Sequence, residues 1–161
     1  MNTENAEIYK ALNINEKDMT AGDAHSVTNN YCKATFSPPI PGVGETFSAS
    51  VFIYASLVSD SVSVLGRSLP DEEHVQLALI IPKTLEDGTH PIEREGTDVV
   101  TGYLTAGFYF VPGSNGKVTF KRDRISNTIE ADFEMRVFYE GAEYHVKNAK
   151  LFVNATGPLD D

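Results

Sequence analysis

Residues 129–137 read Ile-Glu-Ala-Asp-Phe-Glu-Met-Arg-Val, and this stretch decides the fold class. Apolar and charged side chains alternate at every position along it. Because successive side chains of a β-strand point to opposite faces, the pattern predicts a strand with one buried face and one face in water. The same period of two recurs from about residue 27 onward, including sets at 47–55 and 98–111. The sequence therefore predicts a mostly β protein.

A second kind of pattern lies at residues 75–81, where both parities are largely apolar. A strand of this kind is typical of a sheet that is covered on both faces. Its longest uninterrupted apolar run, Leu77-Ala78-Leu79-Ile80-Ile81, is far shorter than the roughly 20 residues that a membrane-spanning helix needs. The sequence therefore predicts a doubly covered strand here and no transmembrane segment.

Turn-forming pairs separate the predicted strands. Asn115-Gly116 predicts a tight hairpin, because both residues tolerate positive φ, and Glu140-Gly141 predicts another turn. In the last predicted strand the parity of the apolar residues changes near Lys147-Asn148, which predicts one inserted residue, a β-bulge. Seven to nine strands separated by such turns predict an all-β fold. We expect an antiparallel β-sandwich, with a closed β-barrel as the alternative.

The first residues do not follow the period of two that runs through the rest of the chain. Ile8 and Leu12 lie four apart, which predicts either a short amphipathic helix or a frayed tail. A length of 161 residues suits one domain. We therefore expect an N-terminal extension over residues 1–26 and a single β-sandwich domain over residues 27–161.

The net charge of −10 has the wrong sign for a nucleic-acid partner. Cys32 is the only cysteine, so the chain forms no intrachain disulfide. The opening residues lack the positive start and apolar stretch of a secretory signal. This predicts a cytoplasmic protein for the chain as given, or an envelope-associated one where a leader has been removed.

The sequence contains neither a Gly-x-Ser-x-Gly nucleophile motif nor a phosphate-binding loop, and it shows no cofactor-binding motif. Its densest polar cluster is Asp71-Glu72-Glu73-His74. Asp71, Glu73 and His74 are the candidate ligands for a hard metal ion. If they bind one, we expect the chain to be a metal-assisted hydrolase. The alternative, which we favour, is a solvated turn before the strand at residue 75.

The set at 98–111 suggests a binding surface. On a single strand, one set of side chains falls on the face opposite Leu104, Phe108 and Phe110; it comprises Thr101, Tyr103, Thr105 and Tyr109. Exposed tyrosine rings with hydroxyls suit a sugar ring or a protein partner. The alternative is that these rings pack under a loop or the N-terminal segment, which their apolar area favours.

Three functional hypotheses follow from these observations. The first is a non-catalytic binding or interaction module that recognises a protein or a glycan through the tyrosine face. The second is the metal-assisted hydrolase. The third is a structural or assembly subunit, in which an exposed edge strand near the proline-rich segment at 38–42 pairs with a neighbour. The sequence leaves the oligomeric state open.

The second half of the chain places several pieces in a fixed order: a hydrophobic strand at 74–81, a turn and strand at 87–92, a tyrosine-bearing strand, and further strands at 116–120, 127–133 and 146–152. This order resembles the uncharacterised small β-sandwich domains of bacterial surface lipoproteins. Ala149 stands where such domains tend to have glycine, and the lipoprotein leader with its cysteine is missing. The resemblance implies a sandwich fold and association with the cell envelope, and it supplies no catalytic residues.

Overall fold

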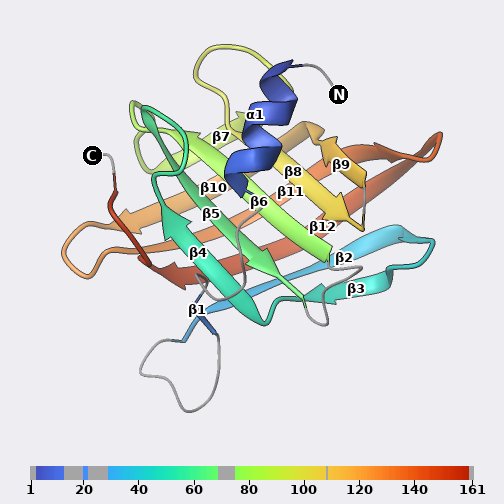
Figure 1. Ribbon diagram of the computed structural model, residues 1–161, viewed down its shortest axis with the longest axis horizontal. Coiled ribbons are helices and arrows are strands. Elements are labelled where there is room, and N and C mark those ends of the chain that lie inside the picture. Colours follow the sequence, from blue (N-terminus) through green and yellow to red (C-terminus); the bar gives the residue numbers. More distant parts are fainter. Residues whose placement is uncertain (1–2, 13–19, 22–28, 69–74, 108, 160–161) are drawn as a thin grey trace.

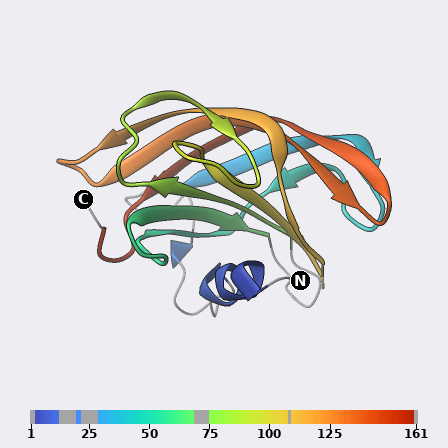
Figure 2. The ribbon, with the colours of Figure 1, turned by 90° about the horizontal axis from the view of Figure 1, so that it is seen from above.

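The computed structural model describes residues 3–12, 20–21, 29–68, 75–107 and 109–159. Two six-stranded antiparallel sheets face each other (Figures 1 and 2). The predicted antiparallel β-sandwich is confirmed, and the sheets do not close into the alternative barrel. The described residues form more strands than the seven to nine expected, partly because the set at 47–55 is divided between the two sheets.

Sheet A has the strand order β1-β4-β5-β6-β8-β9. Its strands are β1 (Thr20–Ala21), β4 (Val51–Ala55), β5 (Ser61–Arg67), β6 (Val75–Pro82), β8 (Thr101–Ala106) and β9 (Tyr109–Pro112).

Sheet B has the order β3-β2-β12-β11-β10-β7. Its strands are β2 (Tyr31–Ile40), β3 (Gly44–Ser48), β7 (Gly88–Ile92), β10 (Ser114–Asp123), β11 (Thr128–Tyr139) and β12 (Ala142–Asn154).

The main core lies between the two sheets. On β11, the odd-numbered residues from Ile129 to Val137 are buried in it, while Glu130, Asp132 and Arg136 are exposed and Glu134 is half-buried. The alternation predicted for residues 129–137 is therefore confirmed. The largest fully buried side chains of this core come from both sheets and include Phe36, Phe52, Tyr54 and Phe120.

A second, smaller core covers the outer face of sheet A. Helix α1 (Thr3–Leu12) lies across this face (Figure 2), and Leu12 packs into a cluster with Leu65, Ile80 and Tyr103. The helix predicted from Ile8 and Leu12 is thus present, and β6 is covered on both sides as its sequence predicts.

Two buried polar side chains of sheet A hold the last turn of α1. The Arg67 guanidinium and the Gln76 amide both donate to the carbonyl oxygen of Leu12, at 3.5 and 3.4 Å, and Arg67 also donates to the Gln76 side-chain oxygen at 2.9 Å. The last carbonyls of a helix lack partners within it, and a cation beside them is favourable. The helix end is therefore satisfied although it is buried.

Two of the local predictions are confirmed. Glu140 and Gly141 connect β11 to β12 as a two-residue turn, both with positive φ. The register of β12 shifts by one residue against both of its neighbours, β11 and β2. At that point Asn148 adopts φ +52°. The β-bulge predicted near Lys147-Asn148 is therefore present.

The hairpin predicted at Asn115-Gly116 is wrong. These residues lie inside β10, which runs unbroken from Ser114 to Asp123 in sheet B, whereas β9 belongs to sheet A. A Cβ atom on Gly116 would overlap the backbone carbonyl oxygen of Glu134. The glycine is required by a close approach of two strands at a register shift, and not by a reversing turn.

The single strand predicted over residues 98–111 is also wrong. Gly107, with φ +59°, begins a two-residue connection that reverses the chain, so that Ala106 pairs with Tyr109. A glycine adopts positive φ without a steric cost, which allows a reversal after only two residues. The reversal changes the phase of every residue after it.

Candidate functional site

The structure does not bring the predicted aromatic site residues together. Tyr103 and Thr105 lie on the outer face of sheet A, but each is only 3% exposed. Phe110 stacks on Tyr103 with ring centroids 4.7 Å apart, and Tyr9 of α1 packs edge-on against Phe110 at 5.2 Å. The prediction of an exposed face is wrong for these residues, because α1 and β9 cover it, as the alternative interpretation held.

Tyr109 lies on the other face of its sheet, because the turn at Gly107 changes its phase. Tyr109 is 45% exposed, and its ring packs edge-on against Tyr139 with centroids 4.8 Å apart; Tyr139 in turn packs edge-on against Tyr144. A hydrogen bond to the Glu140 carboxylate and the negative charge of that group raise the pKa of Tyr109. Thr101 is half-buried at the start of β8.

The predicted metal ligands Asp71, Glu73 and His74 lie outside the described residues. Within the parts of the chain that the structure describes, no three His, Cys, Asp or Glu side chains gather as a metal-binding group. The only described helix, α1, has ten residues, and no helix in the described ranges is long and apolar enough to span a membrane.

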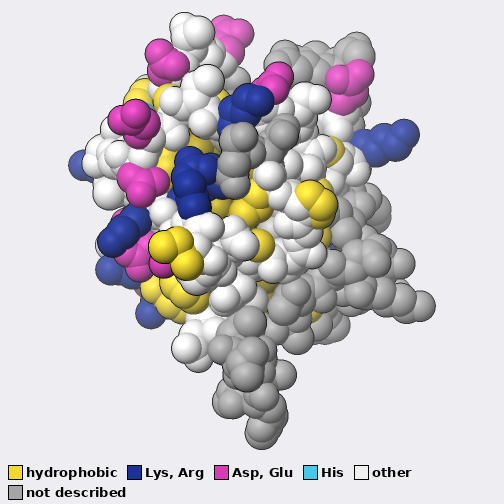
Figure 3. Space-filling model, turned by 90° about the vertical axis from the view of Figure 1, so that its left-hand side faces the viewer, with side chains coloured by type: hydrophobic (Ala, Val, Ile, Leu, Met, Phe, Trp, Pro, Cys, Tyr) yellow, Lys and Arg dark blue, Asp and Glu magenta, His cyan; other side chains and the backbone are white. Residues whose placement is uncertain are grey.

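The outward side chains of sheet B are largely exposed, and none of the described helices or strands covers them. Here the cross-strand pairing arranges the outward side chains in transverse rows. One row runs Tyr31, Phe152, Glu130, Lys121, and the next runs Lys33, Lys150, Asp132, Thr119. We call this outer surface of sheet B the sheet B face. Figure 3 views one end of the molecule, where acidic and basic side chains are intermixed towards the left-hand edge.

An aromatic pair lies in the first of these rows. The rings of Tyr31 and Phe152 are nearly parallel, 22° apart, with centroids separated by 6.5 Å. Tyr31 is 44% exposed and Phe152 is half-buried. The ammonium group of Lys33 lies 5.7 Å from the Tyr31 ring centroid, within the range of a cation–π contact.

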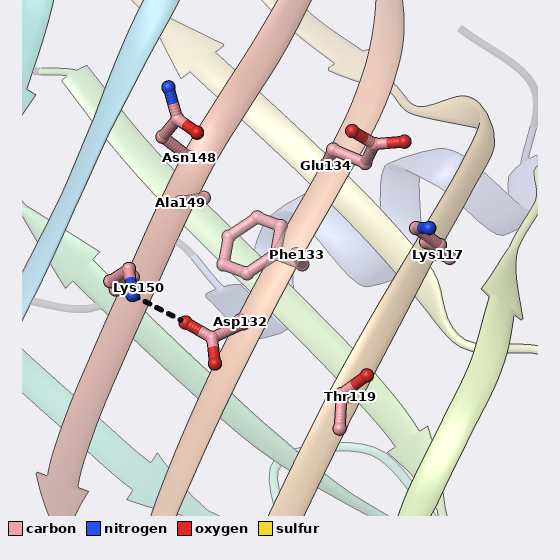
Figure 4. Close-up of a pocket in the computed structure, with 8 residues that line it drawn as sticks. All are labelled: Lys117, Thr119, Asp132, Phe133, Glu134, Asn148, Ala149 and Lys150. Carbon is pink, nitrogen blue, oxygen red and sulfur yellow. Dashed lines mark ion pairs between the residues drawn. The ribbon is translucent and has the colours of Figure 1, made fainter.

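A shallow hollow of about 360 Å³ opens beside Tyr31. Its polar rim comes from three strands and comprises Thr119, Lys121, Glu130, Asp132 and Lys150. A second hollow of about 270 Å³ shares Thr119, Asp132 and Lys150 with the first and continues along β11 to Glu134 and Asn148 (Figure 4). Together the two hollows form a groove that follows β11.

Two register irregularities lie on either side of Glu134, which lines the groove. The bulge of β12 lies on one side of this residue, and the register shift of β10 between Ser114 and Lys117 lies on the other. Bulges bend a sheet and redirect side chains. The Glu134 carboxylate is 3.5 Å from the imidazole of His145, and the Lys150 ammonium is 3.4 Å from the Asp132 carboxylate.

Sequence reasoning missed this surface. It recognised the polar face of β11 as the side that meets water, but it treated that face as solvated and searched for aromatic residues within a single strand. The Tyr31–Phe152 pair joins positions 121 residues apart in sequence, on β2 and β12. Each ring stands on the polar parity of its strand, and this is the available signal: Tyr31 precedes Cys32, and Phe152 lies between Leu151 and Val153.

No protein-family model, curated protein or solved structure matches this chain. The likeness to lipoprotein sandwich domains therefore stays a prediction.

Proposed function

We propose that this protein is a non-catalytic binding module that holds a saccharide chain along the sheet B face. The observation that carries the proposal is the Tyr31–Phe152 pair of nearly parallel rings. Tyr31 lines the 360 Å³ hollow, and Phe152 lines a neighbouring hollow of about 150 Å³ that shares Lys121 and Glu130 with it. A sugar ring has an apolar face that packs on an aromatic ring, and a rigid ring loses little conformational entropy on binding.

The groove also supplies the hydrogen-bonding groups that sugar hydroxyls require. Lys121 and Lys150 donate, while the carboxylates of Glu130 and Asp132 accept. These groups lie on adjacent strands of a sheet, so their backbone positions are fixed before a ligand binds. A hydroxyl acts as both donor and acceptor, and neighbouring hydroxyls of a sugar match such an alternating set.

The composition of the groove favours a saccharide over a protein partner. The centre of a protein interface is depleted in charged residues and enriched in aromatic ones. In the groove, four of the five polar rim residues beside Tyr31 are charged. The exposed ring, Tyr31, lies at one end, while Phe120 and Phe133, which also line the hollows, are buried. An extended chain of several sugar rings suits a groove that follows β11 from Glu130 to Glu134, about 13 Å at the usual rise of a strand.

The proposal is tested by replacing the exposed ring of the pair. Affinity electrophoresis through gels that contain neutral or acidic linear polysaccharides identifies a polymer that retards the protein. For that polymer, Tyr31→Ala is expected to weaken binding by about tenfold, since an aromatic stacking contact contributes up to ~1.5 kcal/mol beyond its buried area.

Phe138→Ala is the matched control, because Phe138 is also an exposed aromatic residue on the sheet B face, 50% exposed, near the turn that ends β11. It is expected to leave retardation unchanged. Equal effects of the two substitutions, or retardation by none of the polymers, would contradict the proposal.

A further inference from the structure

The sheet B face contains an unfavourable pair of like charges. Lys33 of β2 and Lys150 of β12 are direct cross-strand partners, and both point outward. Two like charges directly opposite each other on antiparallel strands destabilise the sheet. The Lys33–Lys150 pair therefore costs free energy in the unliganded protein, which a bound anion would offset.

The carboxylates nearby neutralise only one member of this pair. Asp132 is the next residue in the row and forms an ion pair with Lys150 at 3.4 Å. Among the residues that the structure describes, no carboxylate lies within ion-pair distance of Lys33. The ammonium group of Lys33 instead lies over the ring of Tyr31.

We infer that the saccharide bound on the sheet B face carries carboxylate groups, as a uronate does, and that one of them binds between Lys33 and Lys150. This inference rests on the proposed function. A sugar ring packed on Tyr31 places its substituents beside Lys33, because that ammonium group already lies over the same ring. One ring contact and one charge contact then fix a single sugar unit.

The charges around the groove favour a weakly charged ligand. Glu130, Asp132 and Glu134 all line the two hollows, and the whole chain has a net charge of −10. A densely charged polymer, such as a nucleic acid or a heavily sulfated glycan, would be repelled by these carboxylates. A polymer with a carboxylate on every second sugar, as in hyaluronate, places one charge at the lysine pair and neutral hydroxyl groups on the adjoining sugar along the groove.

The test uses three acidic polymers, polygalacturonate, alginate and hyaluronate, each beside its carboxyl-reduced neutral counterpart. We expect retardation of the protein by at least one acidic polymer and weak or no retardation by its neutral form. Lys33→Gln is expected to weaken that binding about fivefold, as for an exposed ion pair, and Lys33→Arg to retain it.

Lys83→Gln is the control for the change in overall charge, because Lys83 lies just beyond β6 of sheet A and pairs with Asp60 at 3.2 Å. It is expected to leave binding unchanged. Equal weakening by Lys33→Gln and Lys83→Gln overturns the inference, since binding then depends only on net charge.

The failure of the inference is distinguishable from the failure of the proposed function. If acidic and neutral forms bind equally and Tyr31→Ala weakens both, the carboxylate inference is wrong and the saccharide function stands. If none of the three acidic polymers binds while a neutral one does, the carboxylate inference is likewise wrong and the saccharide function stands. If no polymer of either kind binds, both proposals are wrong.

Discussion

The outer faces of the two sheets differ in almost every physical property, although each belongs to an antiparallel sheet of six strands. The outer face of sheet A is apolar and lies beneath α1, with Leu65 and Tyr103 buried in the second core. The outer face of sheet B is charged and open, with Glu130, Asp132 and Lys150 in contact with water. One sheet therefore has two packing partners, and the other has one.

An aromatic residue on the second face of a strand is therefore not by itself evidence of a binding surface. Tyr103 is surrounded by apolar neighbours, so its ring is covered. Tyr31 has Lys33 beside it and charged residues in the same rows, so a covering element would have to bury those charges at a high cost. The residues around a ring decide whether it stays exposed.

The largest effect that we expect is a difference in the free energy of unfolding between substitutions on the two outer faces. Leu65→Ala, beneath α1, is expected to lower the free energy of unfolding by about 2–5 kcal/mol, because it leaves a cavity in a closed core. Lys117→Ala, on the sheet B face, is expected to change it by no more than about 0.5 kcal/mol. Urea unfolding followed by circular dichroism measures both values.

Similar losses of unfolding free energy for the two substitutions would contradict this difference between the two outer faces. A small effect of Leu65→Ala would mean that α1 does not close this face in solution. A large effect of Lys117→Ala would mean that the sheet B face contributes to the packing of the protein.

Much of the architecture was predictable because it depends on local periodicity. The alternation on β11 and the apolar run of β6 determine which faces are buried, and the parity change at Lys147-Asn148 locates the bulge. The errors arose where a glycine has a role that depends on distant residues. Gly116 accommodates the backbone of Glu134, and Gly107 reverses the chain, so neither the hairpin nor the long strand formed as predicted.

The candidate site was not predictable to the same extent, since it is assembled from strands distant in sequence. Sequence indicates that Tyr31 and Lys33 share a parity, and likewise Lys150 and Phe152, but not that β2 and β12 are neighbours. A non-local pairing of this kind sets the rows, and the rows define the surface. The exposure of Tyr109 is real, but its partner is Tyr139 and not Tyr103.

A smaller effect distinguishes the inside of β2 from its outside. Cys32 lies between Tyr31 and Lys33 in sequence but faces the main core, where burial raises the pKa of its thiol from 9.0 to about 12. The thiol of the unfolded chain therefore loses its proton first as the pH rises. The contribution of the buried thiol to the free energy of unfolding is therefore fully present below about pH 9, and above that pH it falls by up to about 1.4 kcal/mol per pH unit.

Urea unfolding of the wild type and of Cys32→Ala at pH 8 and pH 10 measures this effect. The wild type is expected to lose about 1.4 kcal/mol more than the variant between the two pH values. Equal losses would show that Cys32 reaches water in the folded protein, and the separation between the inner and outer sides of β2 would fail at this residue.

The smallest effect concerns Asp123, where β10 ends in the turn at 124–127. Hydrogen bonds from the backbone of Ser126 and Ile125 lower the pKa of its carboxyl group, with further contributions from the Ser126 hydroxyl and Lys121. The charged form is favoured in the folded state, so the stabilisation is present above the unfolded pKa and is lost as the pH falls through the folded value. Carbon-13 NMR titration of the Asp123 carboxyl is expected to give a pKa below 3.8, and Ser126→Ala is expected to raise it while the two backbone donors still hold it below that value. A pKa of 3.8 or above in the wild type would show that the turn is open. The pKa values of Cys32 and Asp123 shift in opposite directions because of the surroundings of each group. An interior without donors disfavours the charged form, whereas backbone donors on an open surface favour it.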